Sequence, residues 1–453
     1  MADLQIITIP GRISETIADI PGDKSISHRA LMIGAISESK VRVQRFLFSQ
    51  DCQNTMTMFR VMGVHIDTDP KAQTVTISGR GLHGLERPSE ILDAGNSGTC
   101  IRLMTGLLSA QPFESRITGD TSVQKRPMGR VTRVLNQMGA RIDGQSSGDD
   151  VRPPLTINKG FKKGEEIALK PITYELPVAS AQVKSAILLA AITQPITVTV
   201  IEPQVTRDHT ERMLEAFGAE IRREGLAVTL TGGKKLHVDG VLEIPGDISS
   251  AAFFIVLGLL HPCAKIRITH VGVNPTRDAV LRVLQRMGAN MEIPPRNMRV
   301  GEPMGNIVVG SSPSLRRTDI LPNEIPILID EIPILAITGL WADGGFEVRG
   351  AKELRVKESD RIRTTLSVIQ AMGGTFVEYE DGFRVEQLPP GEAEQLRHIP
   401  FEVDSGGDHR IAMAALVGAV AAGRRVTVHN TDCMATSFPN FVQIMVSLGV
   451  TFA

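Results

Sequence analysis

One short phrase occurs six times in the sequence: the apolar end of a helix, a glycine, and the start of a strand. The copies are FRVMGVHI, RVLNQMGARI, RMLEAFGAEI, RVLQRMGANM, SVIQAMGGTF and IMVSLGVTF. Their glycines recur about every 70 to 85 residues, at Gly63, Gly139, Gly218, Gly288, Gly373 and Gly449. A glycine just past a helix end suits left-handed backbone, where a Cβ atom is costly. Because solenoid repeats have shorter periods, of about 20 to 50 residues, the pattern predicts six copies of a larger α/β unit.

Each copy contains the same order of elements: an apolar helix, a strand, an amphipathic helix that ends at the glycine, and two strands joined by a turn. In the first copy we expect helix 27–36, strand 40–47, helix 51–62, and strands 64–69 and 74–79. The fifth copy repeats this order, and its Asp381-Gly382 pair is typical of a hairpin turn.

A duplicated motif divides the six copies into two groups of three. Residues 20–23 read Ile-Pro-Gly-Asp, and residues 244–247 read the same. The sixth copy is one strand short, whereas residues 5–10 form a strand outside any copy, so we expect these ends to complete each other. The prediction is one domain over 22–244 and a second over 1–20 plus 246–453, with hinge crossings near 20–23 and 244–247. A closed six-bladed ring is the competing arrangement, which the duplicated motif disfavours.

Composition excludes several classes of function. With 453 residues and 42% apolar content, the chain can fill two cores. Because 49 Lys and Arg face 50 Asp and Glu, we expect no nucleic-acid or membrane partner that binds through net charge. The four cysteines form no CxxC pair, and the first residues show no targeting segment. We therefore expect a cytoplasmic protein.

Polar residues collect where the apolar helices begin. Helix N-termini favour anions such as phosphate, and nearby Arg and Lys side chains would strengthen that preference. The clusters are Lys24–Arg29, Gly95–Arg102, Ser180–Lys184, Asp330–Glu331 and Ser405–Arg410, with the charged loops Lys125–Pro127, Arg207–His209 and Lys357–Arg361. If the helices run in parallel, these residues converge on one face of each domain.

Simpler interpretations exist for the same residues. Asn96, Ser180 and Asp408 could be helix N-caps, and Gly98, Gly406 and Gly407 could be packing or turn glycines. Lys125, Arg207 and Arg361 could lie on solvated faces. Asp330 precedes the apolar run IPILAI, where a carboxylate either caps the helix or takes part in chemistry, and we favour chemistry. His28, His209 and His409 lack metal-ligand spacing, and Cys100 has no recognisable His partner.

These clusters resemble the motifs of the 5-enolpyruvylshikimate-3-phosphate synthase family across essentially the whole chain. The matching stretches are PGDKSISHRALM, GNSGTCIRLM, KRPMGRV, SAQVKSAILLA, RDHTERML, DEIPILA, VKESDRI, DHRIAMA and ATSFPNF. The forms GNSGT, DEIPILA and ATSFPNF are closer to the less common class II subgroup. The resemblance implies an α/β (α+β) fold of two inside-out α/β barrel domains, three βαβαββ units in each, with an active site between them.

The resemblance also implies which residues act. It implies catalytic roles for Asp330, Lys24 and Glu358, with Asp330 as the base. Shikimate 3-phosphate would be bound by Lys24, Ser25, Arg29, Ser180, Ala181, Gln182, Arg207, Asp330 and Lys357. Phosphoenolpyruvate would be bound by Lys24, Asn96, Gly98, Arg126, Gln182, Arg361, His409 and Arg410, with Arg102 in support. One departure is Thr436, which stands where the common class I enzymes carry a lysine, so that lysine's role is not transferred.

The implied reaction moves the enolpyruvyl group of phosphoenolpyruvate to the 5-hydroxyl of shikimate 3-phosphate, in the route to chorismate and aromatic amino acids. It needs no cofactor and no metal, and we expect a monomer. The alternatives are the sister enzyme that transfers enolpyruvate to UDP-N-acetylglucosamine, and a non-catalytic relative that binds phosphorylated ligands. The sister enzyme relies on a loop cysteine and lacks the VKESDRI pattern. A P-loop is also missing from the sequence, which disfavours a nucleotide-binding protein.

Overall fold

The computed structural model describes residues 3–17, 20–148, 150–293, 297–299 and 301–453. Its contacts divide the chain into two compact units. The first unit comprises Gly22–Ile244 with Met298–Glu302, and the second comprises Met1–Pro21, Pro245–Asn297 and Pro303–Ala453. Among the described residues, no helix is long and apolar enough to cross a membrane.

The first unit contains three apolar helices, each with a sheet of its own. These helices are α1 (Lys24–Ala35), α3 (Gly98–Ser109) and α6 (Ala181–Ala191). The other helices are α2 (Gln50–Val61), α4 (Thr121–Gln124), α5 (Gly129–Gln137) and α7 (His209–Ala216). The strands are β3 (Lys40–Gln44), β4 (Ile66–Asp69), β5 (Thr74–Ser78), β6 (Leu92–Asp93), β7 (Ser115–Thr118), β8 (Ile142–Ser147), β9 (Asp150–Ile157), β10 (Ile172–Glu175), β11 (Thr197–Ile201), β12 (Glu220–Glu224), β13 (Ala227–Thr231) and β14 (Val241–Glu243).

The three sheets of the first unit share one strand order. They run β14-β3-β5-β4, β6-β7-β9-β8 and β10-β11-β13-β12. In each sheet the first two strands are parallel and the remaining pairs are antiparallel. The apolar helices are buried on nearly all sides, because their side chains pack on one another and on the sheets.

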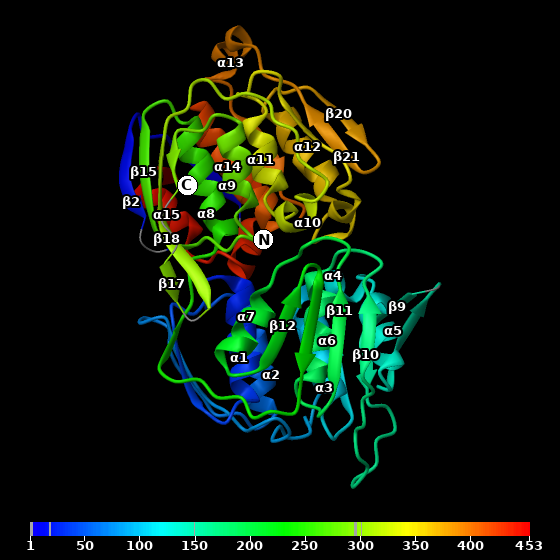
Figure 1. Ribbon diagram of the computed structural model, residues 1–453. Coiled ribbons are helices and arrows are strands. Elements are labelled where there is room, and N and C mark those ends of the chain that lie inside the picture. Colours follow the sequence, from blue (N-terminus) through cyan, green and yellow to red (C-terminus); the bar gives the residue numbers. More distant parts are fainter. Residues whose placement is uncertain (1–2, 18–19, 149, 294–296, 300) are drawn as a thin grey trace. The chain divides into compact units, whose positions relative to one another are not determined.

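The second unit also has three apolar helices, α8 (Ile248–Leu260), α11 (Ile332–Thr338) and α14 (His409–Ala422), but among the described residues its three sheets differ in their number of strands. Its other helices are α9 (Ala279–Arg286), α10 (Ile325–Leu328), α12 (Arg361–Ala371), α13 (Pro390–Leu396) and α15 (Phe441–Ser447), with 3-10 turns at Lys352–Val356 and Thr431–Thr436. The strands are β1 (Leu4–Thr8), β2 (Ile13–Ile17), β15 (Ala264–Gly272), β16 (Met291–Glu292), β17 (Asn297–Arg299), β18 (Glu302–Gly310), β19 (Phe346–Val348), β20 (Phe376–Tyr379), β21 (Gly382–Val385), β22 (Phe401–Asp404), β23 (Val426–His429) and β24 (Thr451–Phe452). In Figure 1, β2, β15 and β18 lie on one side of these helices, and β20 and β21 lie on another.

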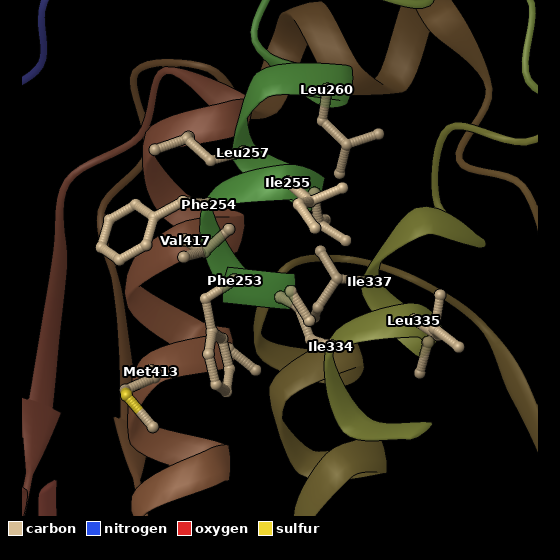
Figure 2. Close-up of a cluster of buried hydrophobic side chains, with 14 of the residues drawn as sticks. Phe253, Phe254, Ile255, Leu257, Leu260, Ile334, Leu335, Ile337, Met413 and Val417 are labelled. Atoms are coloured by element: carbon tan, nitrogen blue, oxygen red, sulfur yellow. The ribbon is translucent and has the colours of Figure 1, made fainter. Parts of the chain in front are cut away.

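The core of the second unit forms where its three apolar helices meet. Phe253 and Phe254 of α8, Ile334 and Ile337 of α11, and Met413 of α14 are nearly inaccessible to solvent. Figure 2 shows Ile334 and Ile337 directed toward α8, whereas the Phe254 ring points away from α11. That ring packs against the rings of Phe438 and Phe441. Burial of large apolar side chains contributes about 1.5 to 3 kcal/mol each, so packing, and not intrinsic helix propensity, fixes these helices.

The repeated glycines have the predicted backbone. Gly63, Gly139, Gly218, Gly288, Gly373 and Gly449 all have φ between 83° and 102°. β1 pairs antiparallel with both β23 and β24, so the strand near the N-terminus completes the sheet of the sixth copy.

The predicted hairpin turn in the fifth copy differs in one detail. Tyr379 pairs with Gly382, so the two-residue loop is Glu380-Asp381 and Gly382 is the first residue of β21. A Cβ atom on Gly382 would lie 2.0 Å from the carbonyl oxygen of Val348. The glycine is therefore required by the close approach of β19, and not by the turn.

A short segment crosses the predicted domain boundary. The prediction assigned all of 246–453 to the second domain, whereas Met298–Glu302 clusters with the first unit. His209 Nδ1 lies 2.7 Å from Glu302 Oε1, and Arg212 Nη1 donates to the carbonyl oxygen of Gly301 at 3.0 Å. These polar contacts hold the segment on the start of α7.

Candidate functional site

The start of α1 carries the first predicted cation. Asp23 caps this helix, because its Oδ1 accepts a hydrogen bond from the backbone N–H of Ile26 at 2.9 Å. Lys24 follows directly, and its Nζ donates to Asp51 Oδ2 at 3.0 Å. The lysine side chain is 20% exposed whereas Asp51 is 4% exposed. The ammonium group is therefore held by a buried carboxylate while remaining open to a ligand.

Arg29 lies one turn farther into α1 and is buried. Its Nε donates to Thr210 Oγ1 at 2.6 Å, Nη1 donates to the Ser25 carbonyl oxygen at 2.9 Å, and Nη2 donates to Ser185 Oγ at 2.9 Å. Burial lowers the pKa of Arg29 to about 10, and the nearby charge of Arg207 adds to this decrease. Arg29 thus joins α1 to α6 and α7 and fixes the backbone at Ser25.

The start of α3 lies between two guanidinium groups. A Cβ atom on Gly98 would lie 2.6 Å from Arg126 Nη1 and 3.0 Å from Arg102 Nη1. Arg126 is buried, and its Nη2 donates to Asn96 Oδ1 at 3.4 Å. A Cβ atom at this position would therefore require the ends of the arginine side chains to shift.

Gln182 at the start of α6 connects to the same place. Arg102 Nη1 donates to Gln182 Oε1 at 2.8 Å, and Gln182 Nε2 donates to Thr99 Oγ1 at 3.0 Å. Ser180 caps α6 through a bond of 3.4 Å from the backbone N–H of Val183, and Ala181 begins the helix. We call Lys24, Ser25, Arg29, Asn96, Gly98, Arg102, Arg126, Ser180, Ala181 and Gln182 the Lys24 cluster. Arg207 is half-buried in the loop before α7.

A second cluster in the second unit is centred on Arg361, the first residue of α12. Its Nε donates to Asp408 Oδ2 at 2.8 Å, Nη1 donates to Asp330 Oδ1 at 3.1 Å, and Nη2 pairs with Glu358. Burial alone would lower the pKa of Arg361, but the three carboxylates raise it well above its usual value. Arg361 is 1% exposed, so it holds the three acidic side chains from inside the unit.

Arg410 ties the start of α14 to this group. Its Nη1 donates to the backbone carbonyl oxygen of Asp330 at 2.9 Å, and its Nε lies 3.9 Å from Asp330 Oδ1. His409 beside it is buried, with Nδ1 4.0 Å from Asp408 Oδ1. Burial lowers the pKa of Lys357, although the negative charge of Asp330 opposes this effect. We call Asp330, Lys357, Glu358, Arg361, Asp408, His409 and Arg410 the Arg361 cluster.

The structure decides several of the simpler interpretations. Ser180 and Asp408 are N-caps, but Asn96 is not, because Ser97 caps α3 and the Asn96 amide bonds Asp120 instead. Asp330 is not a cap either, since α11 is preceded by Glu331 at the cap position. Lys125 is exposed, as expected of a solvated charge.

Two further interpretations concerned metals and thiols. Among the described residues, no group of three or more His, Cys, Asp and Glu side chains is arranged to hold a metal ion. Burial raises the pKa of the Cys100 thiol to about 12, and a neutral thiol is a poor nucleophile.

Sequence reasoning gave no role to Asp51 and treated Asp408 only as a cap. Asp408 also binds Arg361 and accepts a bond of 3.1 Å from Ser359 Oγ. Both carboxylates bind cations that are distant in the sequence, so no local motif indicates these ion pairs. The only local indication was an acidic residue in or next to a helix start.

Comparisons with known proteins show the family of this chain. A family model described as EPSP synthase (3-phosphoshikimate 1-carboxyvinyltransferase) matches residues 7–445. The chain belongs to this family.

Relatives in the EPSP synthase family align over almost the whole chain. A Bacillus cereus (strain ATCC 10987 / NRS 248) protein named 3-phosphoshikimate 1-carboxyvinyltransferase is 45% identical over 425 residues, which is 94% of each chain. A Shouchella clausii protein of the same name is 43% identical over 436 residues, 96% of each chain. The structure of EPSP synthase from Acinetobacter baumannii aligns with a TM-score of 0.83 at 40% identity, covering 100% of this chain and 99% of that one.

A more distant structure shares the fold alone. The enolpyruvyl transferase NikO from Streptomyces tendae aligns with a TM-score of 0.77 at 19% identity, over 100% of this chain and 98% of that one. The fold is therefore the two-domain α/β fold of the EPSP synthase family.

Thr436, which stands where class I members of the EPSP synthase family carry a lysine, has a simple local structure. Thr436 ends a 3-10 turn, and its Oγ1 donates to the Cys433 carbonyl oxygen at 2.7 Å. Phe438, two residues later, packs edge-on against Phe254 and Phe441. Phe438 thus anchors the segment in the core of the second unit. The hydroxyl group of Thr436 carries no charge and cannot replace the lysine of the class I enzymes.

Proposed function

We propose that this protein transfers the enolpyruvyl group of phosphoenolpyruvate to the 5-hydroxyl of shikimate 3-phosphate and releases phosphate. The observation that carries this proposal is the EPSP synthase family match over residues 7–445. Both named clusters support it, because they contain the residue types that two phosphorylated, carboxylated substrates need. The product would enter the route to chorismate and aromatic amino acids.

We assign the Lys24 cluster to anion binding. Arg102 and Arg126 flank Gly98 at the start of α3, where the helix dipole also favours negative charge. A guanidinium group can bind a phosphate or a carboxylate with two parallel hydrogen bonds. We therefore place phosphoenolpyruvate at Gly98, Arg126, Asn96 and Gln182, and shikimate 3-phosphate at Ser25, Arg29, Ser180, Ala181, Gln182 and Arg207. Lys24 would contact both.

We assign the Arg361 cluster to proton transfer and to further anion binding. Asp330 would accept the proton of the substrate 5-hydroxyl, and Lys357 would help to bind shikimate 3-phosphate. Arg410, Arg361 and His409 would neutralise phosphoenolpyruvate. Because Asp330 is bonded through both its side chain and its backbone, the carboxylate has a fixed orientation, which general base catalysis requires.

The reaction needs two steps. In the first, the 5-hydroxyl oxygen forms a bond to C2 of phosphoenolpyruvate, C3 gains a proton, and the hydroxyl proton passes to Asp330. In the second, the bond between C2 and the phosphate oxygen breaks, C3 loses a proton, and the enol ether and phosphate leave. Lys24 and Glu358 are the proposed groups for the proton at C3. The cations position and neutralise the anions while charge changes at C2.

The test is phosphate release from phosphoenolpyruvate with different acceptors. We expect release with shikimate 3-phosphate and at least about 100-fold less with shikimate, because shikimate cannot use the phosphate contacts. UDP-N-acetylglucosamine as acceptor tests the sister activity. Release with that acceptor alone would overturn the proposal, and binding of both substrates without release would indicate a non-catalytic relative.

A further inference from the structure

His28 is a buried imidazole to which the proposed reaction gives no task. It lies on α1 one turn after Lys24 and is 0% exposed. Its Nδ1 is 2.8 Å from Thr55 Oγ1 on α2, and its Nε2 is 3.3 Å from Ser97 Oγ, the cap of α3. One side chain therefore joins three helices of the first unit.

The neighbours of His28 assign its tautomer. Ser97 Oγ accepts a bond of 3.1 Å from the backbone N–H of Cys100, and its own hydrogen is available for His28 Nε2 at 3.3 Å. Thr55 Oγ1 lies 3.0 Å from Cys100 Sγ and 3.3 Å from the Asp51 carbonyl oxygen. We assign its hydrogen to these two acceptors, so Thr55 Oγ1 accepts from His28 Nδ1–H. Burial, with the charges of Lys24 and Arg29, lowers the pKa of His28 to about 3, so the ring is neutral at pH 7.

The side chain of Ser97 caps α3 and so determines where this helix begins. Ser97 directly precedes Gly98, and the start of the helix has little space around it. The position that a Cβ on Gly98 would occupy is 2.6 Å from Arg126 Nη1 and 3.0 Å from Arg102 Nη1. A small displacement of this turn would therefore change the spacing between the helix start and both guanidinium groups.

We propose that His28 is a positioning residue for phosphoenolpyruvate: by holding Ser97 it fixes the first turn of α3 against Arg102 and Arg126. This inference rests on the proposed function, which places phosphoenolpyruvate at that turn. His28 touches no substrate and acts through Ser97. Loss of the Ser97 bond consequently weakens phosphoenolpyruvate binding more than shikimate 3-phosphate binding.

Two substitutions separate the two bonds of the ring. His28→Asn places an amide near Nδ1 and keeps the bond to Thr55, but it cannot reach Ser97. His28→Gln is longer and places its amide oxygen near Nε2, where it can accept from Ser97. Thr105→Val is the matched control, because it removes another buried polar bond of α3, from Thr105 Oγ1 to the Ile101 carbonyl oxygen at 2.7 Å, away from the first turn.

The experiment measures KM for each substrate from phosphate release, with the other substrate saturating. We expect His28→Asn to raise the KM for phosphoenolpyruvate about tenfold, since small misplacements in a site have effects of this size or larger. The KM for shikimate 3-phosphate should change by less than about twofold, and His28→Gln should restore most of the loss. Thr105→Val should leave both KM values unchanged, although its Tm falls.

Circular dichroism with Tm measurement verifies folding of each variant. If His28→Asn does not fold, Ser97→Ala tests the hold on the first turn of α3, because it removes the His28 bond together with the cap, and it should show a selective increase at least as large. Equal increases in both KM values, or no increase in a folded variant, would overturn the inference about His28. The proposed function would remain intact in that case, provided that the wild-type protein is active. Wild-type protein without phosphate release would overturn both together.

Discussion

Asp330 is fixed from two directions by arginines of different helices. Its carboxylate accepts a bond from Arg361 on α12, and its backbone carbonyl accepts one from Arg410 on α14. The Asp330 side chain is nevertheless 16% exposed, whereas Arg361 is 1% exposed. The acid is thus the more accessible member of this ion pair, which suits a group that receives a proton.

Removal of the Asp330 carboxylate should affect turnover more than binding. We expect Asp330→Ala to lower kcat by a factor on the order of 100 or more, with KM values within about tenfold, because a general base contributes about 10² to 10⁴ in rate. Steady-state phosphate release measures both constants. Asp319→Ala is the control, since Asp319 is 85% exposed and lies 3.8 Å from its arginine partner. A normal kcat in Asp330→Ala would remove this residue from the chemistry.

The buried neutral state of His28 should make the protein sensitive to acid. The unfolded chain binds a proton at His28 below the usual pKa of about 6.5, whereas the folded chain binds it only near pH 3. The contribution of neutral His28 to the stability of the fold is therefore complete above pH 6.5 and is lost as the pH falls toward 3. Between pH 7 and pH 4.5 the protonation of this one residue should lower the free energy of unfolding by about 2.5 kcal/mol.

Urea unfolding of wild type and His28→Gln at both pH values measures this effect. The difference in unfolding free energy between the two pH values should be smaller in the variant, because glutamine does not titrate. Equal pH dependence in the two proteins would contradict the assignment of a neutral imidazole.

At the scale of single residues, sequence reasoning did not predict the partners of the polar side chains. It considered Asn96 as a cap, yet the adjacent Ser97 caps α3 while Asn96 bonds Arg126 and Asp120. Both residues can cap a helix, and the choice depends on side chains that arrive from a loop beyond the next strand. Such tertiary competition has no trace in the local sequence.

A buried triad holds three elements of the first unit together. Lys184 Nζ on α6 lies 2.7 Å from Glu202 Oε2, just after β11, and 2.7 Å from Glu211 Oε1 on α7. All three side chains are nearly inaccessible to solvent. The charges of both glutamates outweigh the effect of burial and raise the pKa of Lys184. The lysine therefore stabilises two carboxylates that would otherwise be costly to bury.

Replacement of the lysine alone should be strongly destabilising. We expect Lys184→Met to lower the free energy of unfolding by about 3 to 5 kcal/mol, because it leaves two carboxylates buried without their cation. The midpoint of urea unfolding measures the change. Lys235→Met is the control: Lys235 is 78% exposed in its pair with Glu38, and such surface pairs contribute about 0 to 1 kcal/mol. Equal losses in the two variants would show that the triad contributes no more than a surface pair.

At the scale of elements, apolar periodicity and the positions of glycines predicted the helices of the first copy to within a few residues. The first copy was expected at helices 27–36 and 51–62, and the structure has Lys24–Ala35 and Gln50–Val61. The early start of the first helix reflects the Asp23 cap, which extends it over polar residues that carry no apolar periodicity. Apolar spacing therefore locates a helix, but caps determine where it begins.

At the scale of the whole molecule, the repeated motif carried information that single elements did not. Duplication of Ile-Pro-Gly-Asp indicated a division into three and three units, and each structural unit contains three sheets among the described residues. The segment Met298–Glu302 could not have been assigned from sequence, because its association depends on single contacts such as His209 with Glu302. Sequence repeats predict the architecture, but they do not predict isolated polar contacts between residues that are distant in the sequence.

The same reasoning predicts what strand β1 contributes. Leu4 pairs with Val428 in β23 and Ile6 pairs with Phe452 in β24, so β1 is the central connection of that sheet. Ile6 is 0% exposed and Ile7 is 47% exposed, which gives a matched pair of substitutions on one strand. Ile6→Ala should destabilise the second unit by about 2 to 5 kcal/mol through the cavity it leaves. Ile7→Ala should change stability by less than about 0.5 kcal/mol.

Hydrogen exchange locates the effect. Amides of β23 and β24 should exchange faster in Ile6→Ala, while those of β11 in the first unit keep their wild-type rates, because each unit has its own core. Unchanged exchange in β23 and β24 would mean that the sheet is stable without the buried contact of Ile6. Faster exchange in β11 as well would mean that the two cores unfold as one cooperative body, so a strand from one end of the chain would stabilise both.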